Sequence, residues 1–215
     1  MASDMPLAHS PRNGALAQTY FEHVTHVSKE AVRNAQCANL YHSGDRAALV
    51  DWVEAASLYH DLGKLDKANQ DVLEQDSRNP LPIAHEDAGV AALWELRQKE
   101  SAVIVAAHHA GMFSKSKESP PNKKRLFRNE RQVSDVSGST VDTHVDSQLS
   151  GYLSTHVKCG LNRAAGPKNE QLHRCGFTRR IALSCIVDAD HGDTARHYGN
   201  EVETPSIETR WKDRL

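Results

Sequence analysis

The sequence predicts an all-α protein, a compact helical bundle. Three observations support this prediction: apolar residues recur at helical spacing in several segments, strand-like alternation is scarce, and internal repeats are absent. The chain has 215 residues, of which 39% are hydrophobic and 25% charged. This composition is typical of a globular protein with its own core. We therefore expect a single domain over residues 1–215.

Five helices are expected, and each has its own signal. The first carries apolar residues three and four positions apart, and the second ends at Gly63, a common helix stop. The third has acidic residues in its first turn. The fourth is almost entirely apolar, and its alanines favour a buried helix over a strand. The last places Phe177, Ile181, Cys185 and Asp188 on one face. These helices are expected over residues 16–32, 48–63, 84–98, 101–111 and 177–190.

Residues 112–176 differ from the rest in being rich in Ser, Asn, Lys, Arg and Gly. They predict a long, partly irregular insertion with short helices around residues 145–157. Within it, residues 115–131 hold seven Lys or Arg against two Glu, with Phe127 available for stacking on a base. This stretch is either a cationic track for single-stranded DNA or a solvated loop. A second, weaker basic group consists of Arg174, Arg179 and Arg180.

Bulk properties exclude several classes of protein. The formal net charge is −2, so only a local patch would bind nucleic acid. No apolar run approaches the roughly 20 residues that cross a bilayer, and no signal peptide is recognisable. A cytoplasmic protein without membrane contact is expected. The four scattered cysteines lack a CxxC pair and predict reduced thiols rather than a zinc ribbon or disulfides.

Metal-capable side chains recur at the ends or beside the apolar faces of the predicted helices. Each has an ordinary alternative, such as a hydrogen-bonded core histidine or a solvated helix end. His108 and His109, however, follow five apolar residues, so at least one imidazole is buried, which costs several kcal/mol without a partner. The candidates are His23, His60, Asp61, His85, His108, His109 and Asp188.

Five histidines and two aspartates on separate helices converge only if the helices pack around a common centre. Imidazole and carboxylate ligands suit Mn, Fe, Co, Ni or Zn, whereas Mg prefers oxygen alone. Seven ligands are too many for one tetrahedral ion. They suit two ions roughly 3.5–4 Å apart, the arrangement used for phosphoester cleavage. Neighbouring helical residues point about 100° apart, so His60 can reach one ion while Asp61 bridges to another.

These motifs resemble the HD phosphohydrolase superfamily. More narrowly, they are similar to the nuclease domain of the CRISPR-associated helicase-nuclease of type I systems. The similarity runs from about Leu16 to Ala195, with the insertion unmatched. The segments that carry it are "HDLGKLDKANQ", "AHEDAG", "AAHHAG" and "RIALSCIVDADHGDTA".

The resemblance implies two divalent transition-metal ions, with Mn, Ni, Co or Fe favoured and Mg or Zn as alternatives. One ion would be held by His23, His60, Asp61 and Asp188. Asp61 would bridge to a second ion, held by His85, His108 and His109. Lys64 matches the family's lysine that faces the scissile phosphate. His26, one turn after His23, and His191, beside Asp188, remain alternative ligands.

The resemblance also implies an activity, namely metal-dependent cleavage of single-stranded DNA that a crRNA-guided surveillance complex exposes. The chain has no phosphate-binding loop of a helicase, so a helicase subunit or a helicase domain of a longer chain is the expected partner. Two alternatives remain, an HD phosphohydrolase acting on nucleotides or other small phosphoesters and a non-catalytic scaffold. The sequence leaves open the physiological metal and the choice between internal and terminal cleavage.

Overall fold

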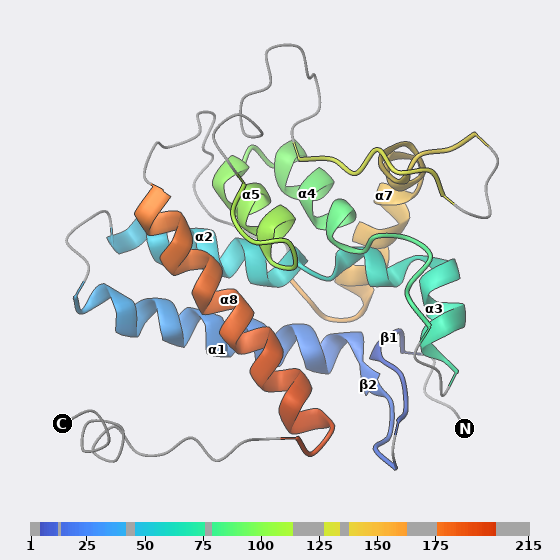
Figure 1. Ribbon diagram of the computed structural model, residues 1–215, viewed down its shortest axis with the longest axis horizontal. Coiled ribbons are helices and arrows are strands. Elements are labelled where there is room, and N and C mark those ends of the chain that lie inside the picture. Colours follow the sequence, from blue (N-terminus) through green and yellow to red (C-terminus); the bar gives the residue numbers. More distant parts are fainter. Residues whose placement is uncertain are drawn as a thin grey trace.

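The computed structural model describes residues 5–12, 14–41, 46–75, 79–113, 127–133, 138–162 and 176–200. It is a helical bundle with one small sheet near the N-terminus, which confirms the all-α prediction (Figure 1). No helix within these ranges is long and apolar enough to cross a membrane. The elements are β1 (Leu7–His9), β2 (Gln18–Thr19), α1 (Tyr20–Asn39), α2 (Arg46–Tyr59), the 3-10 helix η1 (Leu62–Leu65), α3 (Lys67–Leu73), α4 (Glu86–Glu95), α5 (Lys99–Ala107), α7 (Val141–Lys158) and α8 (Gly176–His197).

Helix α1 begins at Tyr20, later than expected, because the residues before it form strand β2 and pair antiparallel with β1. Thr19 then caps the helix. Its hydroxyl accepts a hydrogen bond from the Glu22 amide at 3.2 Å, and the Glu22 carboxylate accepts one from the Thr19 amide at 3.1 Å. Leu16 therefore lies outside the helix and is 83% exposed.

The core lies between α1, α2, α4, α5, α7 and α8. Helix α8 packs across α1 and α2, and α4 and α5 pack against each other (Figure 1). Helix α5 is buried from Glu100 to Ala107, which explains why its sequence is apolar on all sides. Its one buried acid, Glu100, accepts two hydrogen bonds from the Arg179 guanidinium of α8, at 2.5 and 3.0 Å.

Helix α7 lies in the region expected to be irregular. The short helices expected there form one continuous helix of 18 residues, whose buried face joins the main core. This face has the four- and three-residue spacing of an amphipathic helix. The parts of the expected insertion at 114–126, 134–137 and 163–175 lie outside the described residues. The buried apolar residues of α7 are Val141, Val145, Leu149 and Tyr152.

Two arginines of the predicted basic groups are committed to ion pairs within the fold. Arg179 binds Glu100, and Arg128 lies 2.7 Å from a carboxylate oxygen of Asp87 and 2.8 Å from one of Asp146. The Phe127 ring also packs inward, with its centroid 5.3 Å from that of Phe113 and 6.4 Å from that of Trp94. These side chains therefore hold the fold together, and a DNA track over residues 115–131 would depend on other residues of the stretch.

Candidate metal centre

One group of ligand atoms converges from α1, the end of α2 and α8. The His23 Nε2 atom lies 3.4 Å from His60 Nε2 and 3.3 Å from Asp190 Oδ1. The His60 Nε2 and Asp190 Oδ1 atoms are 4.0 Å apart. Nitrogen and oxygen ligands of one ion, each bound at about 2.1 Å, lie about 3 Å from one another. The three atoms, called group one here, are thus close to a coordinating arrangement.

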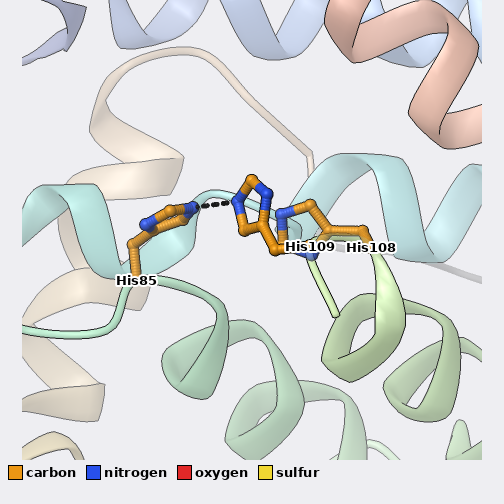
Figure 2. A group of neighbouring side chains, drawn as sticks. All are labelled: His85, His108 and His109. Carbon is orange, nitrogen blue, oxygen red and sulfur yellow. Dashed lines mark hydrogen bonds between the residues drawn. The ribbon is translucent and has the colours of Figure 1, made fainter. Parts of the chain in front are cut away.

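A second group forms where α4 begins and α5 ends. It consists of His85, His108 and His109, and Figure 2 shows the His85 and His109 rings directed toward each other. Their Nε2 atoms are 2.7 Å apart. The His108 Nε2 atom is buried and has no hydrogen-bond partner in the part of the chain that the structure describes. Such an atom costs free energy unless a ligand satisfies it, and a cation would do so. These residues are group two.

Asp61 lies between the two groups. Its Oδ2 atom is 3.1 Å from His23 Nε2, and its Oδ1 atom is 3.3 Å from His85 Nε2. Burial opposes ionisation, but the nearby Lys64 and His60 hold the pKa of Asp61 well below its usual range. The Lys64 Nζ atom lies 2.6 Å from Oδ2. The carboxylate is therefore ionised and presents a different oxygen to each group.

Local backbone structure aims two of the histidines. His60 and His108 each follow the last residue of a helix, and each bonds back to the carbonyl three residues earlier. His60 Nδ1 donates to Ser57 at 2.7 Å, and His108 Nδ1 donates to Val105 at 2.6 Å. Burial lowers the pKa of both imidazoles, that of His108 to about 3. Both rings are thus neutral, with the Nε2 lone pair left for an ion, as in metal-binding histidines generally.

Asp193 orients the His23 ring in a similar way. Its Oδ2 atom accepts hydrogen bonds from His23 Nδ1 and from the side-chain Nε2 of Gln18, both at 2.8 Å. Burial alone would lower the pKa of His23, but its hydrogen bonds to Asp190, Asp193 and Asp61 raise it to about 10. An ion bound by His23 Nε2 would therefore displace a proton. Sequence reasoning missed Asp193, because nothing in the sequence indicated its contact with His23.

His26 is not part of either group. Its Nδ1 atom lies 3.1 Å from Asp193 Oδ1, and its side chain is 58% exposed. The histidine one turn before it, His23, is the one that faces the centre. The other alternative ligand, His191, is exposed on α8 and also lies outside both groups.

The structure places Asp188 outside the centre, and Asp190 takes the position expected for it. Asp188 is exposed on α8, whereas Asp190 is buried and faces His23. The predicted buried face of this helix ran through Phe177, whose side chain is 67% exposed. Two residues rotate a helix by about 200°, so this shift exchanges the outer and the inner aspartate. The actual buried face includes Thr178, Ala182, Cys185 and Ala189, and its small alanines were the available signal.

The other predicted ligands are brought together. Group one and Asp61 offer two imidazoles and two carboxylates, and group two adds three imidazoles beside Asp61. Such nitrogen-rich sets suit divalent transition-metal ions. Convergent Nε2 atoms, an ionised carboxylate between them and the unsatisfied His108 nitrogen all fit bound cations. The residues of this chain that the structure brings together are His23, His60, Asp61, His85, His108 and His109.

Comparison with known proteins identifies one family. The family model described as "Cas3, HD domain" matches residues 7–161, more than half of the chain. The matched part runs from β1 through α7, so it includes the helix that motif comparison left unmatched, and it ends before α8. No curated protein and no solved structure matches the chain.

Proposed function

The chain belongs to the Cas3 HD-domain family, metal-dependent nucleases or phosphohydrolases of CRISPR systems, and we propose that its substrate is single-stranded DNA. The observation that carries the proposal is the position of Asp61 between two groups of ligands. When bound there, two divalent ions supply a polarised phosphate oxygen and an activated water, the chemistry of phosphodiester hydrolysis. The proposed partners are a helicase and a crRNA-guided surveillance complex in the cytoplasm.

The residues of the chain have separate tasks in this proposal. His23, His60 and Asp190 would hold one ion, and the three histidines of group two would hold the other, with Asp61 shared. Lys64 is buried at the edge of the centre and brings a positive charge within 2.6 Å of the Asp61 carboxylate. We assign Lys64 to the stabilisation of negative charge on the phosphoryl oxygens. Asp193 keeps the His23 ring oriented through its 2.8 Å contact with Nδ1.

The exposure of group two favours a polymeric substrate. His109 is exposed, and the His85 side chain is 16% exposed, whereas His23 and His60 are fully buried. A phosphodiester of a long strand can approach such a centre from the surface. The strand reaches the centre without entering an enclosed pocket, the kind of site that would favour a small nucleotide.

The experiment that tests this function is cleavage of circular and linear single-stranded DNA by the wild type, Asp61→Asn and Asp188→Asn. Mg, Mn, Ni, Co and EDTA are compared. We expect a transition metal to support cutting of the circle, EDTA to abolish it and Asp61→Asn to slow it by at least about 100-fold. Asp188→Asn is the matched control and should cleave like the wild type, because its carboxylate is exposed.

Other outcomes would lead to different conclusions. Cutting of linear DNA alone would leave the proposed substrate in place and make the enzyme an exonuclease. Hydrolysis of nucleotides without cleavage of DNA would transfer the same centre to a small phosphoester. If the protein bound none of these ions, it would be neither a nuclease nor a phosphohydrolase, and the alternative of a non-catalytic scaffold would stand.

A further inference from the structure

The N-terminal strand β1 forms a wall of the metal centre. Its last residue, His9, lies edge-on to His23, with ring centroids 4.6 Å apart and an angle of 87° between the ring planes. His9 belongs to neither group of ligands. On its other side, its Nε2 atom lies 3.3 Å from the Thr194 hydroxyl of α8. His9 is thus next to group one without being part of it.

Two contacts hold this strand in place. Gln70 of α3 accepts a hydrogen bond from the Leu7 amide at 2.8 Å and donates to the Leu7 carbonyl at 2.9 Å. Its amide also donates to the Lys64 carbonyl at 2.6 Å. From the turn after α8, the Tyr198 hydroxyl donates to the Ser10 carbonyl at 2.8 Å. Gln70 therefore ties the strand that carries His9 to the turn that carries Lys64, so both side chains have fixed positions at the centre.

The hydrogen bond at one nitrogen of the His9 ring decides what the other nitrogen can do. A neutral imidazole has one N–H and one acceptor nitrogen. When the Thr194 hydroxyl donates to Nε2, that N–H is at Nδ1. Among the residues that the structure describes, none forms a hydrogen bond with His9 Nδ1. This donor remains available for a ligand oxygen.

We propose that His9 is a substrate-binding residue, whose Nδ1–H donates a hydrogen bond to a non-bridging oxygen of the phosphate bound next to Lys64. The strand β1 would thereby supply a side chain to the reaction centre that neither binds a metal ion nor transfers a proton. This inference rests on the proposed function and adds to it a phosphate contact outside the predicted motifs.

The test uses His9→Ala, His9→Asn and the matched control His191→Ala, which removes an exposed histidine of α8. Calorimetry measures binding of Mn²⁺ and then binding of inorganic phosphate to the Mn-loaded protein. We expect all variants to bind the same number of Mn ions. His9→Ala should bind phosphate about tenfold more weakly, since it loses a hydrogen bond to a charged group. His9→Asn, whose amide can replace the Nδ1–H, should recover part of the loss.

DNA cleavage by the same variants separates this inference from the function on which it rests. His9→Ala should lower kcat/KM by about tenfold, with His191→Ala unchanged. Unchanged phosphate affinity in His9→Ala would overturn the inference even if the wild type cleaves DNA. Loss of a Mn ion in His9→Ala would overturn it as well, because His9 would then be a ligand. A wild type that binds phosphate through His9 but leaves DNA intact would contradict only the proposed substrate.

Discussion

Buried histidines have two different tasks in this protein, and their hydrogen bonds distinguish them. His60 and His108 bond through Nδ1 to a backbone carbonyl, and their Nε2 atoms face the metal centre. His156 of α7 is satisfied on both sides. Its Nδ1 atom lies 3.0 Å from the Tyr20 hydroxyl, and its Nε2 atom lies 3.4 Å from the Asn162 carbonyl oxygen. It is a core histidine, the ordinary alternative to a ligand.

Stability at acidic pH should depend on His156. Burial lowers its pKa to about 4, whereas the ring in the unfolded chain titrates near its ordinary value of 6.5. The unfolded state therefore binds the proton first as pH falls, so the free energy of unfolding is intact above 6.5 and declines toward pH 4. By pH 5 this decline is about 2 kcal/mol. Urea unfolding at pH 7.5 and 5 should show a larger loss in the wild type than in His156→Asn; parallel losses would contradict the assignment.

At the scale of elements, the centre depends on a close contact between η1 and the start of α4. The Gly63 amide donates to the His85 carbonyl at 3.0 Å, and a Cβ atom on Gly63 would lie 2.5 Å from that oxygen. Asn69 of α3 supports the contact by donating to the carbonyls of Gly63 and Ile83, both at 2.9 Å. The glycine of the "HDLGK" segment therefore lets His85 approach Asp61.

Gly63→Ala should weaken one metal site while leaving the other in place. The added methyl group would push the His85 backbone away from η1, so we expect at least about tenfold weaker binding of one Mn ion and about 1–3 kcal/mol lower stability. Gly151→Ala is the control, because nothing lies within 4 Å of a Cβ atom at this position in α7. It should raise stability by about 0.5–1 kcal/mol. Calorimetric titration measures the affinity for Mn ions, and thermal unfolding measures the stability of each variant. Two Mn ions bound with wild-type affinity in Gly63→Ala would contradict the role of the contact.

At the scale of the whole molecule, the centre joins elements that are far apart in the chain. Group one takes residues from α1, the end of α2 and α8, and group two takes residues from both ends of the α4–α5 pair. Asp61 connects the groups. Bound ions would therefore cross-link most of the bundle. Because the ligands converge only in the folded state, ion binding would stabilise the folded protein relative to the unfolded chain.

Mn²⁺ should raise the unfolding temperature of the wild type. Binding at a concentration 100 times the Kd adds about 2.7 kcal/mol per site, which corresponds to about 5–10 °C for a chain of this size. Asp190→Asn should show a smaller rise, because group one loses its carboxylate. Asp188→Asn should behave like the wild type. Differential scanning calorimetry makes the comparison, and the reverse order of the two variants would show that the assignment of the α8 ligand is wrong.

The sequence by itself determined the helical fold and most of the candidate ligands. Helical periodicity, which is a local property, predicted five of the helices that the described residues form, namely α1, α2, α4, α5 and α8. The "HD" and "HH" pairs at helix ends marked His60, Asp61, His108 and His109, because the chemistry of adjacent ligands can be recognised within a few residues. The family resemblance rested on the same short segments and agrees with the family that matches residues 7–161.

Only the tertiary structure decided which side of each helix faces the centre. It selected Asp190 over Asp188, placed Asp193 behind His23 and brought the strand with His9 to the same place. It also showed that Arg128 and Arg179 form internal ion pairs. Periodicity defines a stripe on a helix, but the element that packs against the stripe sets the helix rotation. Contacts between residues 170 or more positions apart, such as His23 with Asp193, depend on that packing and leave no local pattern in the sequence.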